Sequence, residues 1–215
     1  INNSSSIHAI SNLYVNNSFG TEVYSIHIEN NLFEGNHSML GGALLFGGSA
    51  QNPENVTNPN DPSLICRNNI FLRNTTELGT GGMMVWNPAG SAVIENNFFI
   101  ENESTASTHN ENLAACGVLG LGNTTFEDSI YTNHILVNVT GRNCVFSNNA
   151  GRSAGAIVAI ADEMHNVNIE NCTLYGNRAV DHDGTGGIRY FGHGTGTVHS
   201  LNVKNCILWN NGKKE

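Results

Sequence analysis

Hydrophobic and polar residues recur in a fixed order along this chain. The nine residues 28–36, Ile-Glu-Asn-Asn-Leu-Phe-Glu-Gly-Asn, have five further copies, which begin at Cys66, Ile94, Gly141, Ile169 and Val203. In every copy the third and ninth places are Asn, and the sixth place is Phe or Leu. Such self-similarity is typical of a solenoid, in which each repeat forms one coil.

Two further elements separate one copy of this phrase from the next. A bend and a short apolar strand follow each phrase, beginning near Gly41, Gly81, Cys116, Ala154 and Gly186. A third apolar strand then leads into the next copy. The pattern therefore predicts an all-β solenoid of parallel strands, with three short strands in each coil. Residues 10–18 resemble a degraded earlier copy, which makes about seven coils in one domain over residues 1–215.

The second place of the phrase carries charges that alternate in sign. The series is Glu29, Arg67, Glu95, Arg142, Glu170 and Lys204. If successive copies lie side by side about 4.8 Å apart, as parallel strands do, each acid has a base next to it and like charges are kept apart. This alternation supports the register of the repeats.

The sixth place predicts a column of apolar side chains inside the solenoid. Its members are Phe33, Phe71, Phe99, Phe146, Leu174 and Leu208. One of the two Asn columns, at the third or the ninth place, is expected to point inward at a bend, where its amides bond the coils above and below. We accordingly expect Asn96→Leu, at the third place, to destabilise the fold.

The five cysteines allow two interpretations. Cys144, Cys172 and Cys206 occupy the fourth place of consecutive copies, where earlier copies have Asn. Stacked at one strand spacing, they are close enough for a disulfide, but parallel stacking can misdirect the side chains. The alternative, buried free thiols that fill space like small apolar groups, is favoured. No Cys-x-x-Cys or paired His spacing indicates a zinc site.

Composition and charge exclude several classes of function. Asn is the most frequent residue, 24 residues are Gly and only 13% are charged, which favours tight bends over helices. The formal net charge is −9, with no basic cluster larger than Lys213-Lys214, so a nucleic-acid partner is not expected. No apolar run is long enough for a membrane span and no secretion signal is visible, so the chain is interpreted as a mature form or a fragment of a longer protein.

The alternating motifs resemble those of a known superfamily. Phe-x-x-Asn occurs four times, at Phe33, Phe71, Phe99 and Phe146, and Gly-Gly-Ala-Leu occurs at residues 41–44. In this respect the chain is similar to the right-handed parallel β-helix superfamily with a pectate-lyase-like fold, in particular to polymorphic outer-membrane-protein type repeats. The resemblance implies a right-handed coil and an exported, extracellular or cell-surface protein: an adhesin, a structural filament or a polysaccharide lyase or hydrolase.

Catalysis is the less favoured of these functions. A glycosidase needs two facing carboxylates, and a uronic-acid lyase needs a base and a cation beside the substrate carboxylate. The few candidates are His182, Asp183 and Arg189 for catalysis, with Asp181 and Asp183 for a Ca²⁺ ion, which usually takes six or more oxygens. Loop Asp residues are more often turn formers. We therefore expect a non-catalytic module without a cofactor, with a polysaccharide lyase or hydrolase as the alternative.

The Gly-Gly strands carry consecutive apolar residues, so part of each must face outward. The candidate outward side chains are Leu44, Met84, Leu119 and Ile157, or their neighbours Leu45, Val85, Val158 and Tyr190. A contiguous apolar stripe is covered either by the long loops or by another chain. Open ends of the solenoid, with unpaired strand edges, offer a second contact for protein partners. Outward aromatic candidates for polysaccharide binding are Trp86, Tyr175, Tyr190 and Trp209.

Six Asn-x-Ser/Thr sequons are candidate glycosylation sites if the source glycosylates exported proteins. They begin at Asn36, Asn55, Asn74, Asn102, Asn123 and Asn138. In an Asn-rich chain most such sequons arise by chance.

Overall fold

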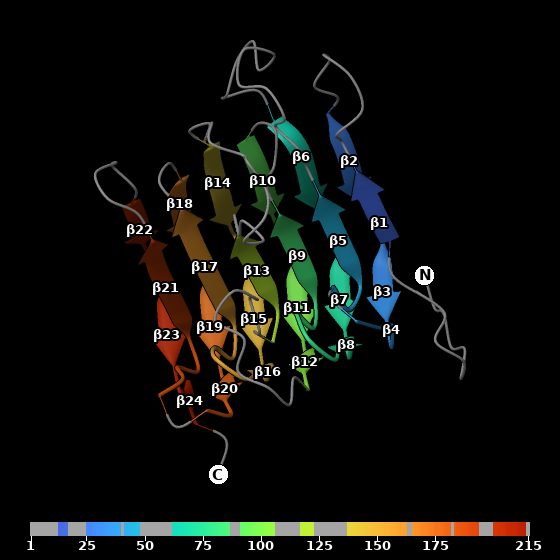
Figure 1. Cartoon of the computed structure of the whole chain (residues 1–215). Coiled ribbons are helices and arrows are strands. Elements are labelled where there is room, and N and C mark those ends of the chain that lie inside the picture. Colours follow the sequence, from blue (N-terminus) through green and yellow to red (C-terminus); the bar gives the residue numbers. More distant parts are fainter. Residues whose placement is uncertain are drawn as a thin grey trace.

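The chain forms a parallel β-solenoid of four stacked sheets, seen in a computed structural model (Figure 1). The structure describes residues 13–16, 25–39, 41–47, 62–86, 91–105, 117–122, 137–162, 165–181, 183–193 and 200–213. Within these residues every regular element is a strand, and every strand pairing is parallel. The predicted all-β solenoid fold is confirmed.

Each sheet takes one strand from each coil and contains six strands. Sheet A, which holds the Gly-Gly strands, consists of β1 (Leu13–Asn16), β5 (Leu44–Gly47), β9 (Met83–Trp86), β13 (Leu119–Gly122), β17 (Ile157–Asp162) and β21 (Ile188–His193). Sheet B, which leads into the phrase, consists of β2 (Ile26–Glu29), β6 (Pro62–Arg67), β10 (Ser91–Glu95), β14 (Val137–Arg142), β18 (His165–Glu170) and β22 (Ser200–Lys204).

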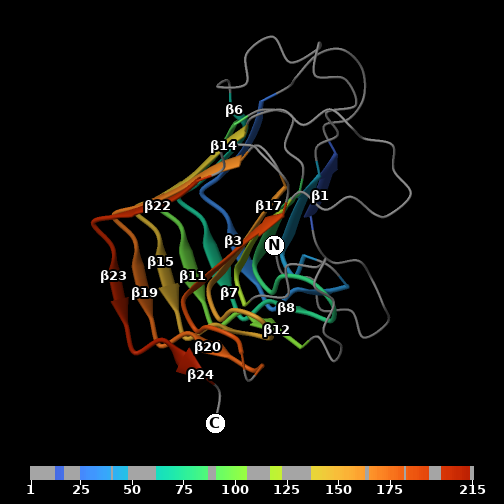
Figure 2. The same cartoon turned by 60° about the vertical axis from the view of Figure 1, so that its left-hand side comes forward.

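The other two sheets have shorter strands. Sheet C consists of β3 (Leu32–Glu34), β7 (Ile70–Leu72), β11 (Phe98–Ile100), β15 (Val145–Ser147), β19 (Thr173–Tyr175) and β23 (Ile207–Trp209). Sheet D consists of β4 (His37–Ser38), β8 (Thr75–Thr76), β12 (Glu103–Ser104), β16 (Ala150–Gly151), β20 (Arg178–Ala179) and β24 (Gly212–Lys213). Figure 2 shows sheets B, C, D and A following one another around the interior.

A coil therefore has four strands, and the prediction of three was wrong. The extra strand is the two-residue strand of sheet D directly after the ninth-place Asn, too short to leave an alternating pattern in the sequence. Among the described residues five coils are complete, from β2–β5 to β18–β21, with β1 before them and β22–β24 after them. β1 pairs with β5, so residues 13–16 repeat a Gly-Gly strand and not the nine-residue phrase.

Two places of the phrase have left-handed backbone conformation and make the bends. At the third place Asn30, Asn96 and their equivalents have φ between 53° and 60°. At the eighth place Gly35, Arg73, Glu101, Asn148, Gly176 and Asn210 have φ between 52° and 66°. Asn and Gly tolerate this region best, which explains the invariant third place. Asn96 is exposed, so its column turns the chain and is not the inward one.

A stacked column of glycines allows sheets A and D to approach closely. Its members are Gly42, Gly81, Gly117, Gly155 and Gly186. A Cβ added at Gly81 would lie 2.6 Å from both the backbone N and the backbone O of Glu103 in β12. Only a residue without a side chain fits at this bend.

The interior holds the predicted apolar column. The rings of Phe33, Phe71, Phe99 and Phe146 stack in order with centroid distances of 4.8, 4.7 and 5.0 Å and interplanar angles of 12° or less. Leu174 continues the column and is fully buried, whereas Leu208 in the last coil is 50% exposed. Within the part of the chain that the structure describes, no helix has the length and hydropathy that a membrane span needs.

Two ladders of buried polar side chains run beside this column. The ninth-place Asn is the inward one: Asn74 Oδ1 accepts from the backbone N–H (3.0 Å) and the side-chain Nδ2 (2.8 Å) of Asn36, and Asn74 Nδ2 donates to the backbone carbonyl of Phe33 (2.9 Å). The pattern repeats through Asn102, Asn149 and Asn177 to Asn211. The fourth-place residues Asn31, Asn69 and Asn97 form a second ladder that the sequence did not predict.

Candidate interaction surface

The outward face of sheet C carries a row of exposed apolar side chains along the solenoid. Phenylalanine or leucine at the sixth place points inward, so the fifth and seventh places point outward. Six of the ten large hydrophobic side chains that the described residues expose lie here. They are Leu32 (42%), Ile70 (41%), Phe98 (48%) and Ile207 (63%) at the fifth place, with Tyr175 (37%) and Trp209 (67%) at the seventh. We call these six residues the sheet C face.

Pairing within sheet C aligns the residues of this face in register, in two groups separated by the half-buried Val145 and Thr173. Leu32 pairs with Ile70, Ile70 with Phe98, and Thr173 with Ile207, each one strand spacing apart. Glu34, at the seventh place of the first copy, forms an ion pair with Arg73. A row of exposed apolar side chains of this kind is typical of a contact surface and not of a catalytic cleft.

The two aromatic residues of the sheet C face lie side by side at the end formed by the last coils. Tyr175 in β19 pairs with Trp209 in β23, and their rings stack with centroids 5.2 Å apart and planes 27° apart. They are the two predicted aromatic binding residues that the structure brings together. Because the rings stack, each covers one face of the other, and the edges and faces that stay open form what we call the Tyr175–Trp209 platform.

The other two aromatic candidates lie elsewhere. Tyr190 in β21 occupies the column of Phe46, Val85 and Ala159, which points inward, and it packs against the core. The expectation that it faces outward was wrong, and desolvation raises the pKa of its phenol. Trp86 ends β9, and its side chain lies outside the described residues.

The apolar residues of the Gly-Gly strands do not form an exposed stripe. At outward positions of sheet A, Met84 is 2% and Val158 0% exposed and Leu45 is half-buried, and the inward Leu44 and Val85 are 0% exposed. The chain itself covers both faces of this sheet, as in parallel sheets generally. The apolar surface left open is on sheet C, which the sequence could have indicated, because the fifth place is apolar in every copy except that of Thr173.

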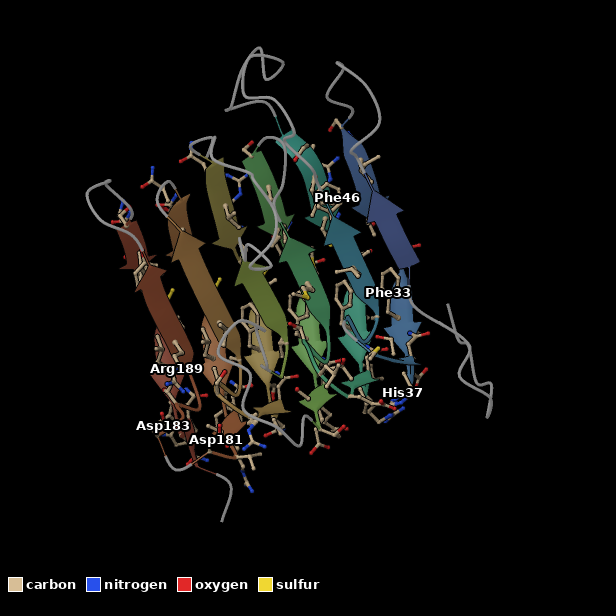
Figure 3. The ribbon with its side chains drawn as sticks, in the orientation of Figure 1. Phe33, His37, Phe46, Asp181, Asp183 and Arg189 are labelled. Atoms are coloured by element: carbon tan, nitrogen blue, oxygen red, sulfur yellow. The ribbon has the colours of Figure 1, made fainter. Side chains whose placement is uncertain are left out.

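The candidate catalytic residues that the structure describes are held in ion pairs beside the fifth complete coil. Arg189 in β21 contacts the carboxylate of Asp183 at 3.2 Å, and Arg152 contacts Asp181 at 3.1 Å. Figure 3 shows Asp181, Asp183 and Arg189 close together at one edge of the solenoid. His182 lies outside the described residues. Each carboxylate thus faces an Arg, and the pair of Asp181 with Arg152 ties the residues after β20 to the preceding coil.

No metal centre is found in the part of the chain that the structure describes, where no group of three or more His, Cys, Asp or Glu side chains could hold an ion. Asp181 and Asp183, proposed from the sequence for Ca²⁺, are instead the partners of Arg152 and Arg189. The described cysteines Cys66, Cys144, Cys172 and Cys206 are free thiols, in agreement with the favoured interpretation.

The Asn residues of the six sequons differ in how deeply they are buried. Asn36, Asn74 and Asn102 belong to the buried ninth-place ladder and are at most 1% exposed, and the Nδ2 of each donates inside the protein, so the folded chain offers no room for a glycan at these three. Asn138 in β14 is half-buried and accepts from Asn166 Nδ2 at 3.3 Å. Asn55 and Asn123 lie outside the described residues.

Comparison of the chain with known protein families, with curated protein sequences and with solved structures found no match.

Proposed function

We propose that this chain is a non-catalytic β-solenoid module of an exported protein, located outside the cell or at its surface, which holds a partner on the sheet C face. The observation that carries the proposal is the row itself: six large apolar side chains, 37% to 67% exposed, aligned on one sheet. Soluble chains seldom leave a contiguous apolar surface of this kind without a partner.

The partner chemistry that this face fits best is carbohydrate. Flat aromatic rings offer an apolar surface for the C–H faces of sugars, and the Tyr175–Trp209 platform is the most exposed aromatic surface among the described residues. The fifth-place row from Ile207 toward Leu32, which includes Phe98 and is interrupted by Thr173, extends the contact along the solenoid axis. We infer that an extended polysaccharide lies along sheet C with its strongest contact at Trp209.

The repeat motifs support a finer assignment of the fold. Phe-x-x-Asn and Gly-Gly-Ala-Leu elements are similar to those of polymorphic outer-membrane-protein type repeats, and parallel strands joined in sequence favour a right-handed connection. We therefore propose a right-handed coil of the pectate-lyase-like superfamily. An experimental structure tests this assignment, and a left-handed coil would contradict it.

Affinity electrophoresis in gels cast with pectin, alginate, chitin or cellulose derivatives tests the carbohydrate proposal. We expect the parent chain to be retarded by at least one polymer and Trp209→Ala to lose most of that retardation. Val180→Ala is the matched control, because Val180 is 48% exposed but follows β20 in sheet D, away from the sheet C face. Retardation by none of the polymers, or equal retardation of Trp209→Ala and parent, would overturn the proposal.

The same gels separate binding from catalysis. A lyase releases unsaturated products that absorb in the ultraviolet, whereas a binding module leaves the polymer intact. Steady release of such products, lost in Arg189→Ala, would favour the polysaccharide lyase alternative over the binding module.

A further inference from the structure

Thiols replace amides at the fourth place of three consecutive copies, although an amide bonds the coil more strongly there. Asn97 at this place accepts from a backbone N–H at 2.9 Å and donates to a backbone carbonyl at 2.8 Å. Its counterpart Cys172 accepts from the N–H of Cys144 at 3.5 Å and donates to the carbonyl of Gly141 at 3.7 Å. A thiol forms weaker hydrogen bonds than an amide. Holding the coil together therefore does not account for the thiols.

Cys144 and Cys172 lie one above the other inside the solenoid. Arg142 and Glu170, two residues before each of them, pair between neighbouring strands. The two side chains have the same direction, because Cys144 Sγ donates to the carbonyl of Arg142 at 3.3 Å and Cys172 Sγ donates to that of Glu170 at 3.2 Å. Equivalent atoms of neighbouring parallel strands are about 4.8 Å apart. The two sulfur atoms are therefore separated by about one strand spacing.

We propose that Cys144 and Cys172 together bind one soft monovalent metal ion, Cu(I), between their sulfur atoms. A disulfide needs the two sulfurs about 2 Å apart, which is much less than one strand spacing. Two collinear metal–sulfur bonds of about 2.3 Å each span about 4.6 Å, which matches that spacing. Cu(I) forms linear complexes with two thiolates, and soft thiolate ligands select it. This inference concerns the interior of the solenoid and does not depend on the carbohydrate function of the sheet C face.

The surroundings of this thiol pair suit a soft ion of low coordination number. Both cysteines are 1% exposed and belong to the hydrophobic core, which keeps water away from a bound ion. Zn²⁺ and Ca²⁺ take four or more ligands. Within the part of the chain that the structure describes, no group of three or more His, Cys, Asp or Glu side chains could supply them. A two-coordinate ion needs only the pair.

Binding displaces protons and leaves the oxidation state of copper unchanged. Each thiol releases its proton to solvent and each sulfur forms one bond to Cu(I), so two thiolates and one monovalent cation have a net charge of −1. The carbonyls that lose a thiol donor keep a backbone partner. The N–H of Asn96 donates to the carbonyl of Arg142 at 3.1 Å, and the N–H of Asn143 donates to that of Glu170 at 3.0 Å. Binding therefore leaves neither of these buried acceptors unpaired.

Refolding the full chain from denaturant without oxygen, with Cu(I) supplied as its acetonitrile complex, tests the site. We expect the desalted protein to retain copper and X-ray absorption to show two sulfur neighbours and no nitrogen or oxygen neighbour. The melting temperature should rise by at least about 5 °C, because the ion binds the folded arrangement and not the unfolded chain. Zn²⁺ should leave it unchanged. Loss of copper on desalting, copper bound through nitrogen or oxygen, or an equal shift with Zn²⁺ would overturn the proposal.

The early copies supply a variant that removes the site and keeps the coil. Cys172→Asn introduces the residue that Asn97 has at the same place, so it preserves a hydrogen-bonding side chain. We expect it to melt close to the copper-free parent and to retain no copper. Cys206→Asn is the matched control, because it makes the same exchange one coil later and leaves the thiol pair intact; it should retain one copper ion per chain. Copper retained by Cys172→Asn, or lost from Cys206→Asn, would contradict the site.

Discussion

The first three copies of the phrase and the last three fill the same places of the solenoid with different chemistry. At the inward fourth place the early copies have Asn31, Asn69 and Asn97, and the late copies have Cys144, Cys172 and Cys206. At the sixth place the aromatic stack extends from Phe33 to Phe146 and is then replaced by leucine. The backbone is the same in both regions, since φ at the third place is 55° at Asn96 and 54° at Asn171.

Hydrogen bonding shows why a thiol can replace the amide. In the early ladder Asn97 Oδ1 accepts from the backbone N–H of Asn69 at 2.9 Å, and Asn97 Nδ2 donates to the carbonyl of Cys66 at 2.8 Å. In the late ladder Cys206 Sγ accepts from the N–H of Cys172 at 3.4 Å and donates to the carbonyl of Ile169 at 3.4 Å. A thiol performs both roles more weakly. The coil therefore needs one acceptor and one donor at this place, and either an amide or a more weakly bonding thiol can supply both.

Removing the side chain in each ladder should give the largest difference between the regions. We expect Asn97→Ala to lower the free energy of unfolding by about 3 kcal/mol or more, because it leaves a buried N–H and a buried carbonyl without partners. Cys172→Ala should cost about 1–2 kcal/mol, mainly for the lost volume. Denaturant unfolding of the two variants beside the parent measures both. Equal losses would mean that the amide ladder contributes no more than packing.

Alkaline pH should act on buried thiols and leave the amides unchanged. Burial raises the pKa of Cys66, whose thiol accepts from Asn69 Nδ2 at 3.3 Å, from 9.0 to about 12. Above pH 9 the unfolded chain loses this proton while the folded chain keeps it, so this contribution to stability is complete below pH 9 and is lost as the pH rises toward 12. At about pH 10.5 the loss amounts to about 2 kcal/mol, from about 1.4 kcal/mol per pH unit.

Denaturant unfolding at neutral and alkaline pH checks this expectation. Cys66→Ala removes the thiol, so its free energy of unfolding should fall less than that of the parent on going to alkaline pH. Some loss remains, because tyrosines and lysines titrate in both proteins. An identical pH dependence of the two proteins would contradict it.

Exchanging residues at the sixth place tests the aromatic column. Phe99→Leu breaks two ring stacks, with Phe71 and with Phe146, and should cost about 1–2 kcal/mol. Leu174→Phe in the late region adds a stack on Phe146 but must fit a larger ring, so we expect a change of less than about 1 kcal/mol in either direction. Thermal unfolding followed by circular dichroism measures both, and a larger loss for Leu174→Phe than for Phe99→Leu would show that the column is sterically limited.

The smallest effect is expected at a bend that both regions share. Glu101 and Asn148 occupy the eighth place in neighbouring copies with φ of 54° and 55°. Asn tolerates this left-handed conformation better than Glu, so Glu101→Asn should raise stability by about 0.5–1 kcal/mol. A slightly higher melting temperature is the expected result, and a lower one would show that the exposed Glu101 has a favourable contact that outweighs its backbone strain.

Much of the fold could be predicted because the repeat fixes the register. Identical places must stack, so the ring column from Phe33 to Phe146 and the alternating charges from Glu29 to Lys204 followed from spacing alone. The two-residue strands of sheet D were not predicted, since strands as short as β8 and β16 show no alternation of apolar and polar residues in the sequence. Which of the two Asn columns points inward was also not predictable, because each column contains Asn for a different reason. The third-place Asn96 provides the left-handed backbone of a bend, whereas the ninth-place Asn102 provides a side chain that forms hydrogen bonds inside the coil.

The candidate site was less predictable than the coil. Tyr175 and Trp209 were predicted from residue type as outward aromatic residues, but their stacking and the sheet C face were not predicted, and the apolar stripe was expected on sheet A. Both sheets show apolar residues in the sequence, and what decides between them is which one the rest of the chain covers. Met84 and Phe98 are equally apolar, yet one is 2% and the other 48% exposed.

The sequence by itself determined that equivalent residues lie one strand spacing apart, which sets the register, the bends and the inward columns. The three-dimensional structure alone decided which faces stay open to solvent and which Asn amides lie inside. The physical reason is that register depends on local pairing between like positions, whereas exposure depends on every segment that packs against a surface, however far away it is in the chain.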